Sequence, residues 1–248
     1  MATTPTLDPR ELNLEGSANF RDLGGLETAG GARVTSGRVF RSDALHGLTA
    51  SDLDVLSALG IAMLVDLRDM REIEESGPSP LLDHGVRHFH APLMPSAAPD
   101  KLPDQSLGME VLYAAMLERA QPRFGEIFQA LAETANLPAV IHCAAGKDRT
   151  GVTVALLLRV LEVPDEVIVL DYALTDRNME RLWARLAANG YARPTGQYPA
   201  HYLRAERSTM ERFLQALDRT FGSAQGYLRE AGVTSSQLAA IRQHLLAS

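Results

Sequence analysis

A short apolar strand, a tight loop and a buried helix follow one another between Pro138 and Leu161, and this segment constrains the fold more than any other. Residues 138–142 (Pro-Ala-Val-Ile-His) suit a short central strand, and residues 150–161 carry the apolar run of a helix buried on most sides. Residues 143–149 must then turn the chain from strand to helix. A strand that leads directly into a buried helix is the unit of α/β proteins, so we expect an α/β fold.

The rest of the chain supplies further strands and helices for the same fold. The patterns predict a helix that opens with a capping box at Thr49 and ends near Gly60, strands over 61–68 and 86–93 with a helix through Glu75 between them, an exposed loop over 94–106, and helices over 107–120 and 123–135. From Pro164 the pattern is helical almost to the end, with breaks at 189–190 and 194–199 and a last helix capped by Thr234 and Gln237. We expect one domain over residues 1–248, in which the helical extension of about 164–248 is not independent.

Bulk composition excludes several classes of protein. Charged residues make up 22% and apolar residues 46% of the chain, as in a folded globular protein, and the net charge of −7 argues against a general nucleic-acid binder. Residues 1–20 contain no secretory signal and no apolar stretch reaches bilayer length, so we expect a cytoplasmic protein without integral membrane contact. Export without a leader stays open, and the sequence predicts no particular oligomeric state.

Cys143 is the only cysteine, which excludes an internal disulfide and a thiolate-rich zinc site. It is therefore either a small buried side chain or a reactive thiol. Its place just before a helix N-terminus, in a loop that also carries Lys147 and Arg149, favours the thiolate because backbone N–H groups and two cations stabilise negative charge there.

The same loop suits a phosphoryl group. Unpaired N–H groups over residues 144–149 (Ala144, Ala145, Gly146, Lys147, Asp148 and Arg149) form an anion nest, and the planar fork of Arg149 can hold two phosphate oxygens. We therefore predict in-line attack of Cys143 sulfur on phosphorus, with no cofactor and no metal. A nucleotide-binding P-loop is excluded because Asp148 stands where that motif has Ser or Thr after its lysine.

The leaving oxygen needs a proton and a later water needs a base. Asp148 is the favoured candidate because the sequence fixes its proximity to Cys143. Asp100 and Asp104, each preceded by proline in the exposed segment, are the alternative if that segment is a mobile loop. His142 is expected to orient Cys143 without transferring a proton. Thr150 either donates its hydroxyl to the sulfur or caps the helix.

The loop His-Cys-Ala-Ala-Gly-Lys-Asp-Arg-Thr-Gly over 142–151 resembles the signature of the Cys-x5-Arg phosphatases, and most closely that of the atypical bacterial tyrosine and lipid phosphatases. The resemblance extends to 19–25 (Asn-Phe-Arg-Asp-Leu-Gly-Gly), 37–42, 65–68, 171–172 and 226–232, and so covers nearly the whole chain. It implies a tyrosine-phosphatase-like fold, a mostly parallel sheet flanked by helices. It also implies hydrolysis of phosphotyrosine through a phosphocysteine, an activity that in this family often extends to phosphoserine, phosphothreonine or phosphoinositides. The chain lacks the Trp-Pro-Asp acid loop of eukaryotic tyrosine phosphatases, which favours Asp148 as the acid.

Three questions stay open at this level. Side chains near strand ends, namely Arg21, Asp22, Arg41, Asp66 and Arg68, are either ligand contacts or salt bridges that pin the N-terminal segment to the sheet. The apolar stripe of the helix over 201–221 favours core packing over a lid or a lipid-facing surface. The alternatives to a protein phosphatase are a phosphoinositide-preferring phosphatase, a rhodanese or arsenate-reductase-like enzyme, and a non-catalytic phosphate-binding module.

Overall fold

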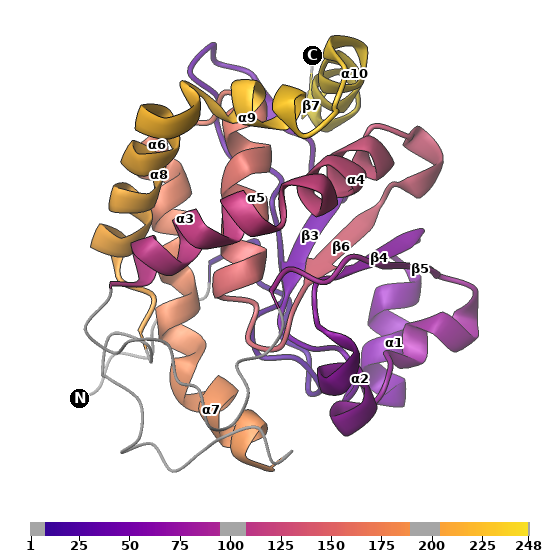
Figure 1. Ribbon diagram of the computed structural model, residues 1–248. Helices are drawn as coiled ribbons and strands as arrows, with labels where there is room; N and C mark the ends of the chain where they lie inside the picture. Colours follow the sequence, from indigo (N-terminus) through magenta and orange to yellow (C-terminus); the bar gives the residue numbers. More distant parts are fainter. Residues whose placement is uncertain (1–7, 95–107, 189–203, 248) are drawn as a thin grey trace, which may run out of the picture.

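A five-stranded sheet forms the centre of the computed structural model, which describes residues 8–94, 108–188 and 204–247 (Figure 1). The strand order is β1-β3-β6-β4-β5, and every pair is parallel except β1 with β3. The strands are β1 (Arg21–Asp22), β3 (Val39–Ser42), β4 (Met63–Asp66), β5 (Arg87–His90) and β6 (Ala139–His142). A separate antiparallel pair joins β2 (Arg33–Val34) to β7 (Leu246–Ala247). The expected α/β sheet is thus confirmed.

Side chains alternate between two apolar layers along the central strands, because successive residues of a strand point to opposite faces. On β6, Ala139 and Ile141 enter the larger cluster with α-helical side chains, whereas Val140 enters the smaller cluster on the other face. Met63 and Leu64 of β4 divide in the same way. Both faces of the sheet are therefore buried, as expected for parallel strands.

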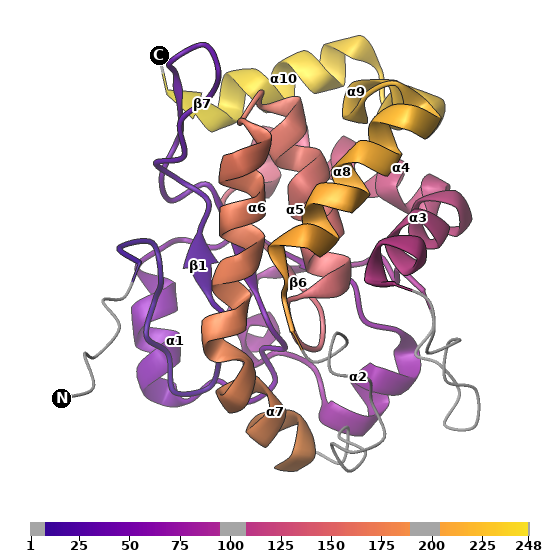
Figure 2. The same cartoon turned by 90° about the vertical axis from the view of Figure 1, so that its left-hand side faces the viewer.

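Most helices cover one face of the sheet. The larger apolar cluster contains residues of α3 to α6 and α8 to α10, and α5, α6 and α8 lie side by side in it (Figure 2). The smaller cluster on the opposite face holds α1 and a 3-10 turn over 80–84. The helices are α1 (Ala50–Ser57), α2 (Met70–Ser76), α3 (Met109–Arg119), α4 (Gln121–Leu131), α5 (Asp148–Val160), α6 (Asp165–Leu174), α7 (Met179–Ala188), α8 (Arg207–Phe221), α9 (Ala224–Glu230) and α10 (Ser235–Leu245). In the described ranges, no helix has the length and apolarity needed to cross a membrane.

The predicted elements agree with the structure in kind and differ at their ends. Thr49 and Thr234 both open helices with complete capping boxes. The helix after the cysteine loop begins at Asp148, two residues earlier than predicted, and the strand predicted over 61–68 is limited to β4. The predicted breaks at 189–190 and 194–199, and nearly all of the predicted loop over 94–106, lie outside the described residues.

The apolar stripe of α8 is used in packing, as favoured above. Met210, Phe213, Leu214 and Leu217 are each at most 1% exposed and belong to the larger cluster. The described part of this helix therefore has its apolar face against the core and does not offer it to a lid or a lipid surface.

Four polar side chains line up at the carboxyl ends of neighbouring strands. In the register of the sheet, Ser42 lies opposite His142, His142 opposite Asp66, and Asp66 opposite His90. Cys143 is the next residue after this row. The loop therefore leaves the sheet at its carboxyl edge, where α/β proteins place their ligand sites.

Candidate active site

Cys143 lies between the end of β6 and the start of α5, with only 2% of its surface exposed. Its Sγ accepts a hydrogen bond from the backbone N–H of Gly146 at 3.2 Å. The loop folds back over the sulfur because only four residues separate Cys143 from the first helical residue, Asp148. The unpaired N–H groups of the first turn of α5 then favour an anion beside the sulfur.

The peptide groups of the loop are oriented from outside. The three consecutive carbonyls of residues 144–146 accept hydrogen bonds from the backbone N–H of Ala44 (3.1 Å), Nδ2 of Asn19 (3.2 Å) and Nη2 of Arg41 (2.8 Å), in that order. In a trans peptide the N–H points away from the C=O. The N–H groups that follow these carbonyls therefore turn to the opposite side, where Cys143 already accepts one of them. This is the geometry of an anion nest.

Gly146 is the one residue whose backbone permits this turn. Its φ is +64°, and a Cβ at this position would lie 2.5 Å from the carbonyl oxygen of Ser42. Any other residue would meet both backbone strain and a clash with the end of β3.

Behind the loop, three arginines form ion pairs with one buried carboxylate, that of Asp171. Oδ2 of Asp171 binds Arg41 at 2.6 Å, and Oδ1 binds Arg21 at 3.2 Å and Arg10 at 2.9 Å. Burial alone would raise the pKa of Asp171, but the three guanidinium groups hold it well below its usual range. For Arg21, burial and the neighbouring Arg41 lower the pKa to about 10. The cluster anchors Arg41, whose other end holds the Gly146 carbonyl.

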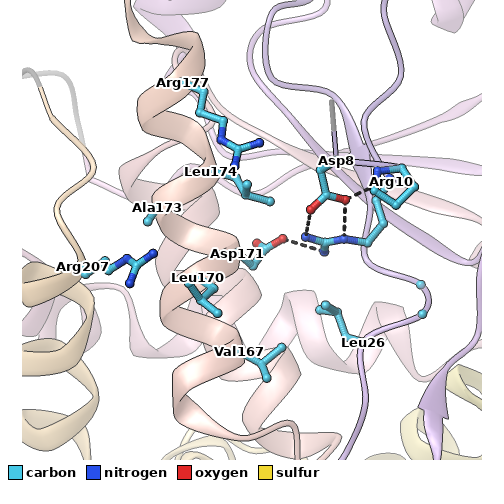
Figure 3. Close-up of a pocket in the computed structure, with 13 residues that line it drawn as sticks. Asp8, Arg10, Leu26, Val167, Leu170, Asp171, Ala173, Leu174, Arg177 and Arg207 are labelled. Carbon is cyan, nitrogen blue, oxygen red and sulfur yellow. Dashed lines mark hydrogen bonds and ion pairs between the residues drawn. The ribbon is translucent and has the colours of Figure 1, made fainter. Parts of the chain in front are cut away.

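Figure 3 shows the outer side of this cluster. Asp8 and Asp171 both contact Arg10 there, at the edge of a cavity of about 540 Å³ between the N-terminal segment and the outer face of α6. Arg10 is thus the member of the cluster that faces away from the loop. Arg21 lies further inside and donates to Oδ1 of Asn19, and Nδ2 of the same asparagine donates to the carbonyls of the loop.

Arg149 is held by Glu72 of α2. Nη1 and Nη2 of Arg149 lie 2.5 and 2.6 Å from the two carboxylate oxygens, and Nη1 also donates to the Leu67 carbonyl at 3.3 Å. Burial opposes the charge of Arg149, but Glu72 outweighs it and raises the pKa above its usual value. Three of five N–H donors are engaged by the described residues, which leaves Nε–H and one hydrogen on Nη2. These two lie on one side of the guanidinium, in the paired arrangement that suits a bidentate contact with an anion.

Asp148 stands at the first position of α5 and is about one-third exposed. Its Oδ1 accepts a hydrogen bond from the hydroxyl of Tyr113 at 2.6 Å and lies 3.4 Å from Nζ of Lys147. Lys147 is buried and also donates to the Arg204 carbonyl at 3.3 Å. The lysine therefore contacts Asp148 and a distant backbone group.

His142, Asp66 and Arg68 form a buried group under the loop. Nε2 of His142 lies 3.8 Å from Oδ2 of Asp66, beyond hydrogen-bonding distance, and burial lowers the pKa of His142 to about 4 despite the attraction of Asp66. Asp66 accepts a two-pronged ion pair from Arg68 at 2.9 and 2.7 Å. Burial acts to raise the pKa of Asp66, whereas His142, His88 and Arg68 together hold it well below its usual range. The group lies at the carboxyl ends of β4 and β6, and Cys143 directly follows His142 in the chain.

The structure brings the loop residues, His142, Asp66 and Arg68 together and leaves other predicted roles undecided. The hydroxyl of Thr150 is buried with no hydrogen-bond partner among the described residues, so its help to the sulfur stays a prediction. Asp100 and Asp104 lie outside the described residues. Arg21 and Arg41 form salt bridges that pin the N-terminal segment, the second of the two roles considered for them. Asp22 holds a turn by accepting the N–H groups of Gly24 and Gly37.

Sequence reasoning gave no role to several residues that shape the site. Glu72 and Tyr113 carried no local signal, because their partners are 77 and 35 residues away. Asn19 and Asp171 occurred only within the stretches that resemble the phosphatase family. Those stretches were the available signal, and their roles became visible only through long-range contacts.

Comparison with known proteins identifies the class. The model of the tyrosine phosphatase family matches residues 12–247, so the chain belongs to this family. The triple specificity protein phosphatase PtpB of Mycobacterium tuberculosis is 30% identical over 94% of this chain and 98% of its own length. A Cupriavidus necator protein named as a candidate tyrosine-protein phosphatase is 33% identical over 96% of this chain and 89% of its own. A tyrosine-protein phosphatase of Nostoc commune is 30% identical over 83% and 73%.

Among solved structures, the core catalytic domain of the PP-IP phosphatase Siw14 from S. cerevisiae covers 87% of this chain and 98% of its own, at 14% identity and a TM-score of 0.42. The assignment therefore rests on the sequence matches. The chain is a cysteine-based phosphatase of the tyrosine phosphatase family and acts on a phosphorylated substrate.

Proposed function

We propose that Cys143 is the nucleophile of a phosphate monoester hydrolase that acts on phosphotyrosine proteins in the cytoplasm. The observation that carries the proposal is the orientation of the loop, whose N–H groups converge on the side of Sγ. The nest, the helix N-terminus and the free edge of Arg149 offer hydrogen bonds to the three non-bridging oxygens of a phosphoryl group. These donors are in place before the substrate arrives, which is what stabilises charge in the transition state.

The reaction has two displacements. In the first, the thiolate of Cys143 forms an S–P bond while the P–O bond to the substrate breaks, and Asp148 gives its proton to the leaving oxygen. In the second, Asp148 takes a proton from water as the water oxygen attacks phosphorus and the S–P bond breaks. Inorganic phosphate and the free thiolate result. The roles of the loop residues, of Asp148 and of the supporting His142 and Thr150 are all part of this proposal.

Asp148 is favoured as the acid because its carboxyl is partly exposed at the first position of α5, directly after the loop. Asp100 or Asp104 is the alternative if Asp148 serves only to fix Lys147. Among the described residues no group of His, Cys, Asp or Glu is arranged to hold a metal ion. The proposed reaction uses the loop and Arg149 to neutralise the phosphate.

The substrate class is drawn from the relatives. PtpB is named a triple specificity phosphatase, which supports an extension of this chain's activity to phosphoserine, phosphothreonine or phosphoinositides. The second candidate is a phosphoinositide-preferring enzyme that uses the same site. The buried Lys147 beside Asp148 favours it, because a further cation in the loop suits a ligand with several phosphates.

The test is hydrolysis of p-nitrophenyl phosphate, in the presence of a chelator, by the wild type and by Cys143→Ser. We expect activity in the wild type, none in the variant, and retained binding of a phosphotyrosine peptide by the variant. Activity in the variant would remove Cys143 as nucleophile. An inactive wild type with its thiol confirmed as reduced would favour a non-catalytic phosphate-binding module. Comparison of a phosphotyrosine peptide with a phosphoinositide in the active enzyme then separates the two candidate functions.

A further inference from the structure

The carboxylate of Asp148 has two oxygens in unlike surroundings. Oδ1 accepts the hydrogen bond of Tyr113 at 2.6 Å and lies 3.4 Å from the ammonium of Lys147. Oδ2 accepts no hydrogen bond from the described residues, and the side chain is about one-third exposed. One oxygen is therefore anchored inside the protein while the other is available to solvent or substrate.

Tyr113 is rigidly placed between three helices. It projects from α3, has no exposed surface, and packs edge-on against Tyr172 of α6 and Phe213 of α8, with ring centres 6.4 and 5.8 Å apart. Its hydroxyl is 2.8 Å from that of Tyr172. Tyr172 is itself held in place, because its ring packs closely against Gly151 of α5, about 3 Å from the position that a Cβ of this glycine would occupy. The chain of contacts therefore runs from α6 through α3 to the first residue of α5.

The direction of these hydrogen bonds follows from counting hydrogens. Each tyrosine hydroxyl has one hydrogen. If Tyr172 donates to Tyr113 and Tyr113 donates to Oδ1 of Asp148, both hydrogens have acceptors. In the opposite direction, the hydrogen of Tyr172 has no acceptor among the described residues, and a buried hydroxyl hydrogen without an acceptor is unfavourable. Burial and the nearby Asp148 raise the pKa of Tyr113 well above its usual value, so Tyr113 keeps its hydrogen.

Protonation of Oδ1 would therefore be unfavourable for two reasons. The added proton would meet the hydrogen that Tyr113 already donates to this oxygen, and it would lie close to the positive charge of Lys147. Arg149, the next residue, is also charged and close to Asp148, but its guanidinium is held by Glu72. The proton of a neutral Asp148 thus resides on Oδ2.

We propose that Tyr113 is a positioning residue for the acid, which binds Oδ1 of Asp148 so that Oδ2 carries the transferable proton towards the leaving oxygen. This inference rests on the proposed function, specifically on Asp148 as the acid. Tyr113 itself does not touch the reacting atoms.

The test is a double-mutant cycle of Tyr113→Phe and Asp148→Asn, measured on p-nitrophenyl phosphate, which has a good leaving group, and on phenyl phosphate, which has a poor one. For Tyr113→Phe we expect kcat on phenyl phosphate to fall at least about tenfold, with kcat on p-nitrophenyl phosphate reduced by less than about threefold and KM little changed on both. In the Asp148→Asn background, the addition of Tyr113→Phe should change neither rate.

The matched control is Tyr227→Phe. Tyr227 is also buried, and its hydroxyl donates to the Leu117 carbonyl at 2.8 Å, so the variant loses one buried hydrogen bond that does not involve Asp148. It should also lose thermal stability, by no more than Tyr113→Phe, which removes two hydrogen bonds, and it should show no change in leaving-group dependence.

The possible results distinguish a positioning role of Tyr113 from a structural one, and a wrong acid assignment from a wrong proposed function. An equal loss on both substrates, or an equal loss with and without Asp148, would assign Tyr113 a structural role and overturn the inference. If Asp148→Asn loses activity equally on both substrates while Cys143→Ser is inactive, the cysteine chemistry stands and the acid assignment, with the role of Tyr113, fails. An inactive wild type would overturn the proposed function itself.

Discussion

Glu72 and Arg149 form a two-pronged ion pair in which both carboxylate oxygens meet both terminal nitrogens of the guanidinium, at 2.5 and 2.6 Å. The same carboxylate closes the capping box of α2, since it accepts the backbone N–H of Asp69 at 2.8 Å. The N-terminus of α2 and the guanidinium of Arg149 are therefore fixed by a single side chain. A residue outside the signature loop thus sets the orientation of its arginine.

Glu72→Gln should lower kcat/KM roughly tenfold to a hundredfold, because a neutral amide cannot accept both N–H donors and Arg149 would lose its fixed orientation. Inhibition by inorganic phosphate should weaken in parallel. The control is Glu75→Gln, one helical turn further on, which breaks only an exposed pair with Arg71. Unchanged phosphate inhibition in Glu72→Gln would mean that the loop alone orients Arg149.

Arg41→Gln and Arg10→Gln each remove one cation from Asp171, but only Arg41 also holds the Gly146 carbonyl. We expect Arg41→Gln to weaken inhibition by orthovanadate about tenfold or more, since the Gly146 peptide of the nest loses its shorter hydrogen bond, at 2.8 Å, and keeps only that from Asn19 at 3.2 Å. Arg10→Gln should change it by less than about twofold while it costs comparable thermal stability. Equal loss of vanadate affinity in the two variants would show that the charge balance at Asp171, and not the carbonyl contact, orients the loop.

The cysteine loop could be predicted because it is contiguous. Strand, turn and helix are adjacent in sequence, so apolar runs and spacing place Cys143 before a helix, and capping boxes such as that at Thr49 locate helix starts. The start of α5 was misplaced by two residues because Asp148 and Arg149 look like loop residues when only polarity is considered. In the structure their backbone is already helical.

The neighbours of the loop could not be predicted in the same way. β3 lies next to β6 in the sheet, yet its buried Arg41 and Ser42 interrupt the apolar pattern expected of a central strand. Arg41 can be buried in this strand because a carboxylate 130 residues away, that of Asp171, neutralises its charge. Asp171 appears as an ordinary polar residue of an amphipathic helix. Ion pairs between distant segments depend on tertiary packing, and no local pattern encodes them.

Gly146→Ala should abolish most activity, by at least about a hundredfold, because the positive φ and the 2.5 Å approach to the Ser42 carbonyl would displace the nest. Gly25→Ala is the matched control. Gly25 has a φ of +81°, and nothing lies within 4 Å of where its Cβ would be, so its substitution should cost about 1 kcal/mol of stability and leave kcat unchanged. An active Gly146→Ala would show that the loop tolerates another backbone conformation.

Because of His142, the free energy of unfolding should begin to fall at a pH above that at which the carboxylates of the protein take up protons. In the unfolded chain a histidine binds a proton below pH about 6.5, whereas burial delays this for His142 in the folded chain to about 4. Between these values protonation favours the unfolded state, so the free energy of unfolding should fall by about 3 kcal/mol as the pH decreases through this window. Asp66 and Asp171, whose pKa values are held low in the folded state, add their losses only below pH about 4.

Urea unfolding at intervals from pH 7.5 to 4.5 would measure this dependence, and comparison of the wild type with His142→Gln isolates the contribution of that residue. The variant should lose most of the slope whatever its absolute stability. A smaller slope should remain, because burial also lowers the pKa of His46. His84→Gln, at an exposed position, should keep the wild-type slope. An unchanged slope in His142→Gln would mean that the pKa of His142 is the same in the folded and the unfolded chain. A steeper slope in the variant would mean that His142 is protonated in the folded protein, as an ion pair with Asp66.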